Sequence, residues 1–195
     1  MRMKNRWNKK AKPQTLEDIA QALGFICWQI TANGVLELEN RGFHTATNYH
    51  RLQIVGEYLA FLLQVADRLC YEQFDESQRA RFILSLARKM ADTFADNQSE
   101  LLQTESAAYR QDFITLLNQR ASEYAEFAWV DDAPNFSFLR YFGEKMAAVL
   151  PGEKSLWISQ YFSEHEALEG VIHLKRALKG LLEKGFTEAT ISTVE

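Results

Sequence analysis

Four histidines are the residues of this 195-residue chain best suited to metal binding or proton transfer: His44, His50, His165 and His173. His165 and His173 share one side of the last predicted helix with Glu169, but that side lies outside the apolar arc of the helix. Solvent-facing ligands do not easily form a closed site, and the chain lacks both the HExxH and the Glu-x-x-His pattern. We therefore predict no metal site and no cofactor, with surface histidines pairing with Glu166 and Glu169.

Signatures of nucleophilic or phosphate chemistry are also missing from the sequence. It contains no GxSxG, and its glycines are not spaced as in a P-loop or a dinucleotide-binding loop. Asp131 and Asp132 stand at a helix break, where acidic residues commonly form turns. A pair of catalytic carboxylates is defined by its separation in space, so a two-carboxylate hydrolase stays open without being favoured. A non-enzymatic role is the favoured interpretation.

Arg120 is the polar residue whose position is hardest to explain from the sequence pattern. A guanidinium on an apolar helical arc must pair with a carboxylate, stack on an aromatic ring or extend its stem to solvent. A structural ion pair or an extended stem is the common explanation. The alternative, which we carry as a hypothesis, is that Arg120 marks a groove that binds an anion or a partner. The arc around Arg120 is formed by Tyr109, Phe113, Leu116, Leu117, Tyr124 and Phe127.

Aromatic residues are concentrated between positions 127 and 162, which hold nine of the 24 in the chain. Short helices cannot bury all of them on one stripe. They form either a second core layer, which is favoured, or an exposed binding surface. Exposed aromatics beside an arginine are typical of interaction hot spots. The predicted binding residues are therefore Arg120, Tyr124, Trp129, Phe136, Tyr141, Trp157 and Tyr161, together with Trp28 on the polar side of the first helix.

Basic residues are unevenly distributed along the chain. Residues 1–13 contain six basic residues and no acid, which leaves a formal charge of −10 on the rest of a chain whose net charge is −4. An acidic body argues against a nucleic-acid-binding face on the folded part, because phosphate binding rests on Lys and Arg. We predict a flexible basic tail at residues 1–13, and nucleic acid or an anionic membrane would bind only through it.

The sequence gives no sign of a secretory leader or a membrane span. No apolar region follows the basic tail. The longest uncharged apolar run in the central predicted helix, residues 58–66, is far shorter than the ~20 residues that cross a bilayer. Cys27 and Cys70 lie on apolar helical faces and are predicted to be buried free thiols. A cytoplasmic location is the expectation.

Residues 48–74 form the most apolar predicted helix. Its apolar residues cover an arc of about 200°, whereas a helix on a protein surface needs only about 100°. Such a helix must be packed on two or more sides. Nine glycines and only three prolines favour long helices over many short strands. The sequence therefore predicts an all-α fold, one irregular bundle of six or seven helices around residues 48–74. The predicted domain spans residues 14–186, with a C-terminal tail at 187–195.

Capping patterns give the boundaries of the other predicted helices. The first begins at Thr15 and is expected to stop at Asn33-Gly34, before a connector over residues 35–47. Asn-Gly also signals a hairpin, but neither face of that hairpin would be consistently apolar. Further helices are predicted from Asp75, from Asn97 to about Val130, from Asn135 or Ser137, and from a Ser163–Glu166 capping box to Lys184-Gly185-Phe186.

Two classes of function are compatible with these features. The first is a non-enzymatic interaction or regulatory module that presents an aromatic and arginine-lined groove to a protein partner or to a second copy of itself. The second is a helical bundle that binds a small apolar or anionic ligand, or a metal, in its interior, and that could be an enzyme. An interior pocket lined by Phe and Leu, with Arg120 at its mouth, would favour the second class. A shallow, exposed aromatic patch would favour the first.

Overall fold

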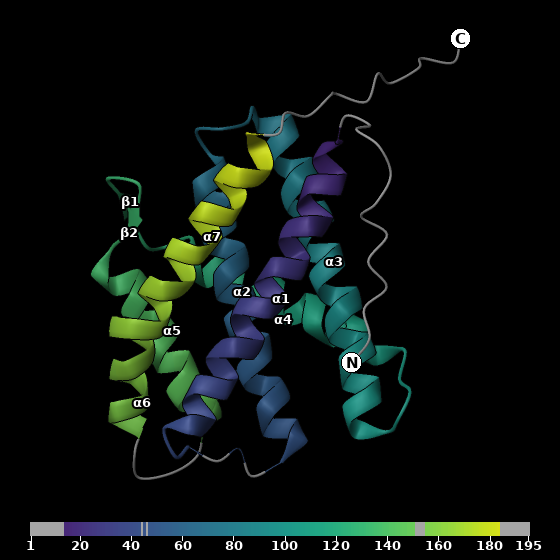
Figure 1. Ribbon diagram of the computed structural model, residues 1–195, viewed down its shortest axis with the longest axis vertical. Helices are drawn as coiled ribbons and strands as arrows, with labels where there is room; N and C mark the ends of the chain where they lie inside the picture. Colours follow the sequence, from purple (N-terminus) through teal and green to yellow (C-terminus); the bar gives the residue numbers. More distant parts are fainter. Residues whose placement is uncertain (1–13, 44, 46, 151–154, 184–195) are drawn as a thin grey trace.

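The computed structural model describes residues 14–43, 45, 47–150 and 155–183, and these residues form an all-α bundle (Figure 1). The predicted fold class is therefore confirmed, whereas the predicted tails at 1–13 and 187–195 lie outside the described residues. A two-residue antiparallel pair, β1 (Trp129–Val130) and β2 (Ala133–Pro134), links α4 to α5. The helices are α1 (Leu16–Asn40), α2 (Asn48–Cys70), α3 (Glu76–Leu102), α4 (Ala108–Tyr124), α5 (Phe136–Val149), α6 (Ser155–Tyr161), the π-helical turn η1 (Phe162–Glu166) and α7 (Ala167–Leu182).

The bundle is organised around α2, as the sequence predicts. α2 contacts α1, α3, α4, α5 and α7, and 15 of its 23 residues are buried. It ends at Cys70 rather than at Phe74, because a turn brings the Phe74 N–H back to the Cys70 carbonyl and the Phe74 ring into the core. A helix covered by five others needs no ligand to explain its apolar surface.

Three predicted helix starts are confirmed. In each, the side-chain oxygen of the residue before the helix accepts a hydrogen bond from a backbone N–H in the first turn, which satisfies one of the donors that a helix start leaves without a partner. The pairs are Thr15 with Asp18, Asp75 with Gln78, and Asn135 with Phe138.

The expected stop of α1 at Asn33-Gly34 is wrong. The helix continues through Gly34 for six more residues, although the choice of a helix over a hairpin is correct. Val35 and Leu38 extend the buried stripe beyond the glycine, so tertiary packing overrides the local stop signal. The left-handed residue of this segment is Gly42, with a φ of 83°.

The predicted helix start at Asn97 is also wrong, because α3 continues past it. The Asn97 side chain is buried and donates to the Thr93 carbonyl at 2.7 Å, one turn back, instead of capping a new helix. The break comes at Gln103, which adopts a left-handed φ of 51°. α4 then ends at Tyr124, and Val130 lies in the short β1–β2 hairpin.

The predicted capping box at Ser163 and Glu166 does not form, because α6, η1 and α7 are one continuous helical segment. The Ser163 hydroxyl donates to the Gln160 carbonyl within the helix. Phe162 and Ala167 are both fully buried on either side of the expected start. Burial of these flanking residues favours a continuous helix over a new helix start.

Most of the aromatic residues between 127 and 162 belong to the core, which answers the question that the sequence left open. Phe142 stacks on Phe61 of α2 with ring centroids 4.1 Å apart, and Phe138 packs edge-on against the same ring at 5.8 Å. Phe136 and Trp157 are the exposed members, at 70% and 42%. Cys27 and Cys70 are buried free thiols, as predicted.

α1 is long and apolar enough, by composition, to cross a membrane. Its uncharged run, residues 19–36, is longer than the run in the central helix on which the sequence-based expectation rests. In the bundle, α1 packs against α2, α3 and α7. The core helix of a globular bundle has the same length and composition, so this finding decides nothing about location.

Gly143 of α5 permits a close approach of α5 to α6, and this approach can be tested. A Cβ at Gly143 would lie 2.2 Å from the Ser159 carbonyl oxygen, a backbone atom that cannot swing aside. We expect Gly143→Ala to lower the free energy of unfolding by about 1–3 kcal/mol, the usual cost of overpacking.

Gly180→Ala in α7 is the matched control, since no atom of the described residues lies within 4 Å of its Cβ position beyond the backbone of its own helix and its two chain neighbours. There the higher helix propensity of alanine should act alone and stabilise by about 0.5–1 kcal/mol. Urea denaturation followed by circular dichroism measures both variants. Equal effects of the two substitutions would contradict the close α5–α6 approach.

Candidate functional site

Arg120 lies in a buried ion-pair network between α2, α4 and α5. Its Nε donates to Glu57 Oε2 at 2.7 Å and its Nη2 to Glu57 Oε1 at 2.6 Å, a bidentate pair that joins α4 to α2. Its Nη1 donates to Glu123 at 2.5 Å, and Glu123 also accepts a hydrogen bond from Tyr141 of α5. The Arg120 and Glu57 side chains are 9% and 7% exposed. The guanidinium thus has the structural ion pair that the sequence pattern allowed, and its role in binding stays a prediction.

The network shifts the pKa values of Arg120, Glu123 and Tyr141. Hydrogen bonds to Glu57 raise the pKa of Arg120 against the opposing effect of burial. Burial raises the pKa of Glu123, but hydrogen bonds from Tyr141, Arg120 and Gln119 together outweigh it and lower that pKa to about 2. Burial and donation to Glu123 both raise the pKa of Tyr141. The Arg120–Glu123 pair is therefore charged at neutral pH.

The other predicted binding residues do not form one surface. Tyr141 packs edge-on against Tyr124 with ring centroids 5.0 Å apart. Trp157 instead stacks between Phe43 and Tyr161. The structure therefore places Tyr124 and Tyr141 together near Arg120, and Trp157 and Tyr161 in a separate stack. Tyr124 and Tyr161 are buried, Trp28, Trp129 and Tyr141 are partly buried, and Phe136 and Trp157 are exposed.

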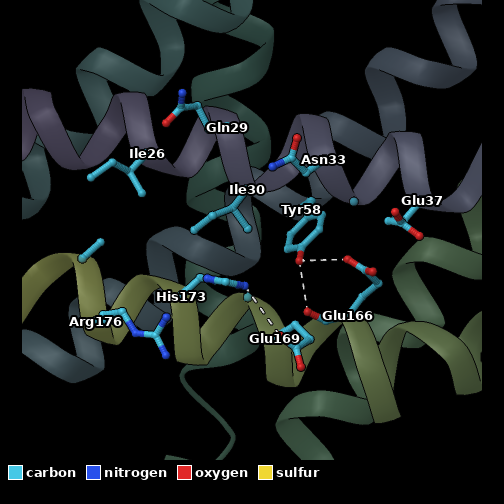
Figure 2. Close-up of a pocket in the computed structure, with 13 residues that line it drawn as sticks. Ile26, Gln29, Ile30, Asn33, Glu37, Tyr58, Glu166, Glu169, His173 and Arg176 are labelled. Carbon is cyan, nitrogen blue, oxygen red and sulfur yellow. Dashed lines mark hydrogen bonds and ion pairs between the residues drawn. The ribbon is translucent and has the colours of Figure 1, made fainter.

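A groove lies between α1 and α7. It has a volume of about 490 Å³, and Figure 2 shows Tyr58 of α2 lying between its two walls. α1 contributes one wall, and η1 and α7 contribute the other. The lining residues are Ile26, Gln29, Ile30, Asn33, Gly34 and Glu37 on the first wall, and Glu166, Glu169, Gly170, His173, Arg176 and Ala177 on the second.

Two glycines make room for Tyr58 at the floor of this α1–α7 groove. A Cβ at Gly34 would lie 2.7 Å from a ring carbon of Tyr58 and 2.8 Å from a carboxylate oxygen of Glu166. A Cβ at Gly170 would lie 2.9 Å from the Tyr58 hydroxyl. Tyr58 therefore passes from the core between two helices at the positions where neither carries a side chain.

Glu166 accepts hydrogen bonds from two tyrosines. The Tyr161 hydroxyl donates to its Oε1 at 2.8 Å. The Tyr58 hydroxyl lies 3.0 Å from the Glu166 carbonyl and 3.3 Å from Oε2, and shares its single hydrogen between them. Glu166 is the last residue of η1, whose widened turn lets the Ala167 N–H reach the Phe162 carbonyl five residues back. Single π-helical turns of this kind occur frequently at functional sites.

Both phenols are protonated donors at neutral pH. Burial raises the pKa of Tyr58 well above its usual value, and the neighbouring Glu166 charge adds to the effect. Burial and the hydrogen bond to Glu166 raise the pKa of Tyr161 to about 12. The Arg41 guanidinium lies 4.8 Å from the centre of the Tyr161 ring and covers its face. The two donors hold the Glu166 carboxylate in one orientation.

The charge of the groove changes along its length. Figure 2 shows Glu37, Glu166 and Glu169 toward one end, and Ile26 and Arg176 toward the other. His173 lies 3.6 Å from Glu169, which is the surface pairing predicted for this histidine. A carboxylate oriented by phenols is a ready acceptor for an ammonium or guanidinium group. Across the described parts of the chain, no group of three His, Cys, Asp or Glu residues could hold a metal ion.

Sequence reasoning placed Glu166, Glu169 and His173 in a surface pairing but missed the groove that these residues line. The sequence pattern predicts Tyr58 as an ordinary core residue, Gly34 as a helix stop and Glu166 as part of a capping box. The structure gives the last two a different role, since both make contacts with Tyr58. The only available signal was that two capping patterns occur where the helices do not use them.

The buried ion pair gives a prediction for stability. Arg120→Met leaves the Glu57 carboxylate buried without its partner, so we expect the free energy of unfolding to fall by about 3–5 kcal/mol. Replacing both partners, as Glu57→Leu with Arg120→Met, should recover most of that loss, because no buried charge remains. Denaturant titration measures each variant. A double variant no more stable than the single one would contradict a purely structural pair.

The close approach of Gly34 to Tyr58 gives a second prediction, in which the cost of one substitution depends on the other residue. Gly34→Ala should destabilise the wild type by about 1–3 kcal/mol, because the alanine methyl group displaces the Tyr58 ring. In a Tyr58→Leu background, the same substitution should cost less, because the ring is absent and alanine is the better helix former, although a Glu166 carboxylate oxygen still lies 2.8 Å from the Cβ position. Thermal and urea denaturation of the four proteins measures the coupling, and additive effects would contradict the contact.

Comparisons of this chain with protein-family models, with curated proteins and with solved structures found no match. The geometry of the α1–α7 groove and of the Arg120 network is therefore the basis on which a function is argued.

Proposed function

We propose that this protein is a non-enzymatic binding module whose α1–α7 groove takes up a positively charged side chain from a protein partner. The observation that carries the proposal is the Glu166 carboxylate, held in the groove by hydrogen bonds from Tyr58 and Tyr161. An oriented carboxylate forms stronger and more directional hydrogen bonds with an ammonium or guanidinium group than a mobile surface carboxylate does.

The charge of the surroundings supports a basic partner. Glu37 and Glu169 line the same end of the groove as Glu166. Apart from the basic residues 1–13, the chain carries a formal charge of −10. A negative field of this kind accelerates the approach of a positively charged segment and discourages an acidic one.

The apolar part of the groove supports a peptide chain rather than a simple ion. Ile26, Ile30 and Ala177 line the groove away from its acidic end. A partner segment with apolar residues next to its basic residue would bury them there, and the combination of an apolar contact with one oriented charge pair is typical of specific binding sites.

The hydrogen bonds of the tyrosines support binding over catalysis. The hydroxyls of Tyr58 and Tyr161 donate to Glu166, and the pKa of each phenol is raised above its usual value. Neither phenol is poised to give up its proton near neutral pH, as a general acid would need to be. The same contacts are well suited to holding a fixed negative charge.

A small amphiphilic cation is the second candidate ligand. The observation that favours it is the groove volume of about 490 Å³, which falls within the range of small-molecule sites. Native mass spectrometry of the purified protein separates the two candidates. A retained small molecule that Glu166→Gln releases would support the second candidate over the first.

Selection of short random peptides on phage tests the proposed function. Peptides selected on the wild type should contain Lys or Arg next to apolar residues. Their affinity for Glu166→Gln should be at least ten-fold weaker, because about 1.5–3 kcal/mol of a charge-assisted hydrogen bond is lost.

Glu164→Gln is the matched control for this experiment, since Glu164 belongs to the same helical turn but is exposed and does not line the groove. It should leave peptide affinity unchanged, and circular dichroism should verify that both variants are folded. The proposal fails if no peptide is enriched, if the enriched peptides lack basic residues, or if the two substitutions have the same effect.

A further inference from the structure

A second groove lies between α3 and α4, away from the α1–α7 groove. It has a volume of about 570 Å³, with α2 at its floor. Its apolar lining comes from all three helices, and Leu84 at its edge is 51% exposed. The two grooves share no lining residue. The apolar residues of this α3–α4 groove are Leu63, Ala80, Ile83, Leu84, Ala87, Ile114, Leu117 and Ala121.

Three arginines line this groove in a chain whose body is acidic. They are Arg79 and Arg88 of α3 and Arg110 of α4. Arg79 pairs with Asp67, the only acidic residue among the lining residues, at 3.3 Å, and Arg110 pairs with Asp92 at 2.6 Å. Each of these pairs uses a small part of the five N–H donors of a guanidinium. Arg88 is exposed, and no ion pair joins it to another described residue.

The shape of the groove fits a helix. Its walls are helices, whose backbone groups are already paired, so an extended strand would find no edge to join. Residues 79–88 of α3 span about 14 Å along the helix axis, the length of two to three helical turns. An apolar channel between two helices accepts a third helix through apolar residues spaced three and four apart.

We propose that the α3–α4 groove docks an acidic amphipathic helix of a partner protein. The apolar face of that helix packs on Ile83, Ala87 and Ile114, and its flanking carboxylates pair with Arg88 and with the remaining donors of Arg79 and Arg110. Charge complementarity selects this occupant. The basic residues 1–13 of the chain itself would be repelled by the arginines, whereas an acidic helix would be attracted.

Selection from a displayed library of amphipathic helices tests this proposal. The library has helices of about 16 residues, long enough for four turns, with leucine fixed on one face and Glu, Lys or Ala varied beside it. Wild-type protein should enrich Glu at the varied positions. Arg88→Glu should weaken the selected peptides by at least five-fold, about 1 kcal/mol for a solvent-exposed charge pair, and its own selection should shift toward Lys.

Arg140→Glu is the matched control, because Arg140 is a highly exposed arginine of α5 outside both grooves and its reversal changes the net charge equally. It should change neither the affinity nor the selected sequences. Absence of Glu enrichment, or an equal response to Arg140→Glu, would overturn the proposal. It would also be overturned if Arg88→Glu separated copies of this chain in sedimentation while the wild type bound no acidic helix, since the occupant would then be a second copy.

Discussion

Each polar side chain that a helix buries needs a hydrogen-bond partner. α2 buries two adjacent polar side chains. Glu57 and Tyr58 are both buried within a helix that five others cover. Consecutive residues point about 100° apart around a helix, so their polar atoms reach different neighbours. Glu57 meets Arg120 between α2 and α4, and Tyr58 meets Glu166 between α1 and α7. If either buried group lost its partner, the folded state would lose more stability than one hydrogen bond contributes. These two contacts therefore fix the positions of the outer helices on α2.

Local patterns predict the parts of this fold that depend on local interactions. The starts of α1, α3 and α5 follow from side chains three residues apart, and the central position of α2 follows from the width of its apolar arc. Gly34 and Glu166 fail as capping signals for a different reason. Gly34 is needed for its missing side chain, and Glu166 accepts a hydrogen bond from Tyr58, 108 positions away. A contact over that separation leaves no trace in the neighbouring sequence. Two of the three places where the local capping rules fail, Gly34 and Glu166, therefore meet at one groove, whereas the third, Asn97, lies within α3 and outside that groove.

The aromatic cluster illustrates the opposite case, in which an unusual composition has a structural cause. Phe138 and Phe142 of α5 surround Phe61 of α2, and Tyr124 of α4 completes the contact with Phe61 and Phe138. These large rings fill the space between α2, α4 and α5. They restrict the packing of the three helices more than flexible aliphatic side chains would. The density of aromatics between 127 and 162 thus follows from the shape of the core. What the sequence could not supply was which few rings lie outside it, because Phe136 and Phe138 differ only in which side of one helical turn they occupy.

The two grooves have opposite charge, and α2 forms the floor of both. A ligand bound in one groove could therefore change the affinity of the other groove through α2. Tyr58 forms the floor of the α1–α7 groove. Leu63 and Asp67, one to three turns further along α2, line the α3–α4 groove. Coupling between two sites requires an element with two arrangements that both ligands bias. α2 is held by the buried Glu57–Arg120 pair and by close-packed rings on several sides, and a shift along its axis would break the pair and open cavities at the same time. The rigidity of α2 therefore argues that the two grooves would act independently, so that the proposed basic segment and the proposed acidic helix would not compete.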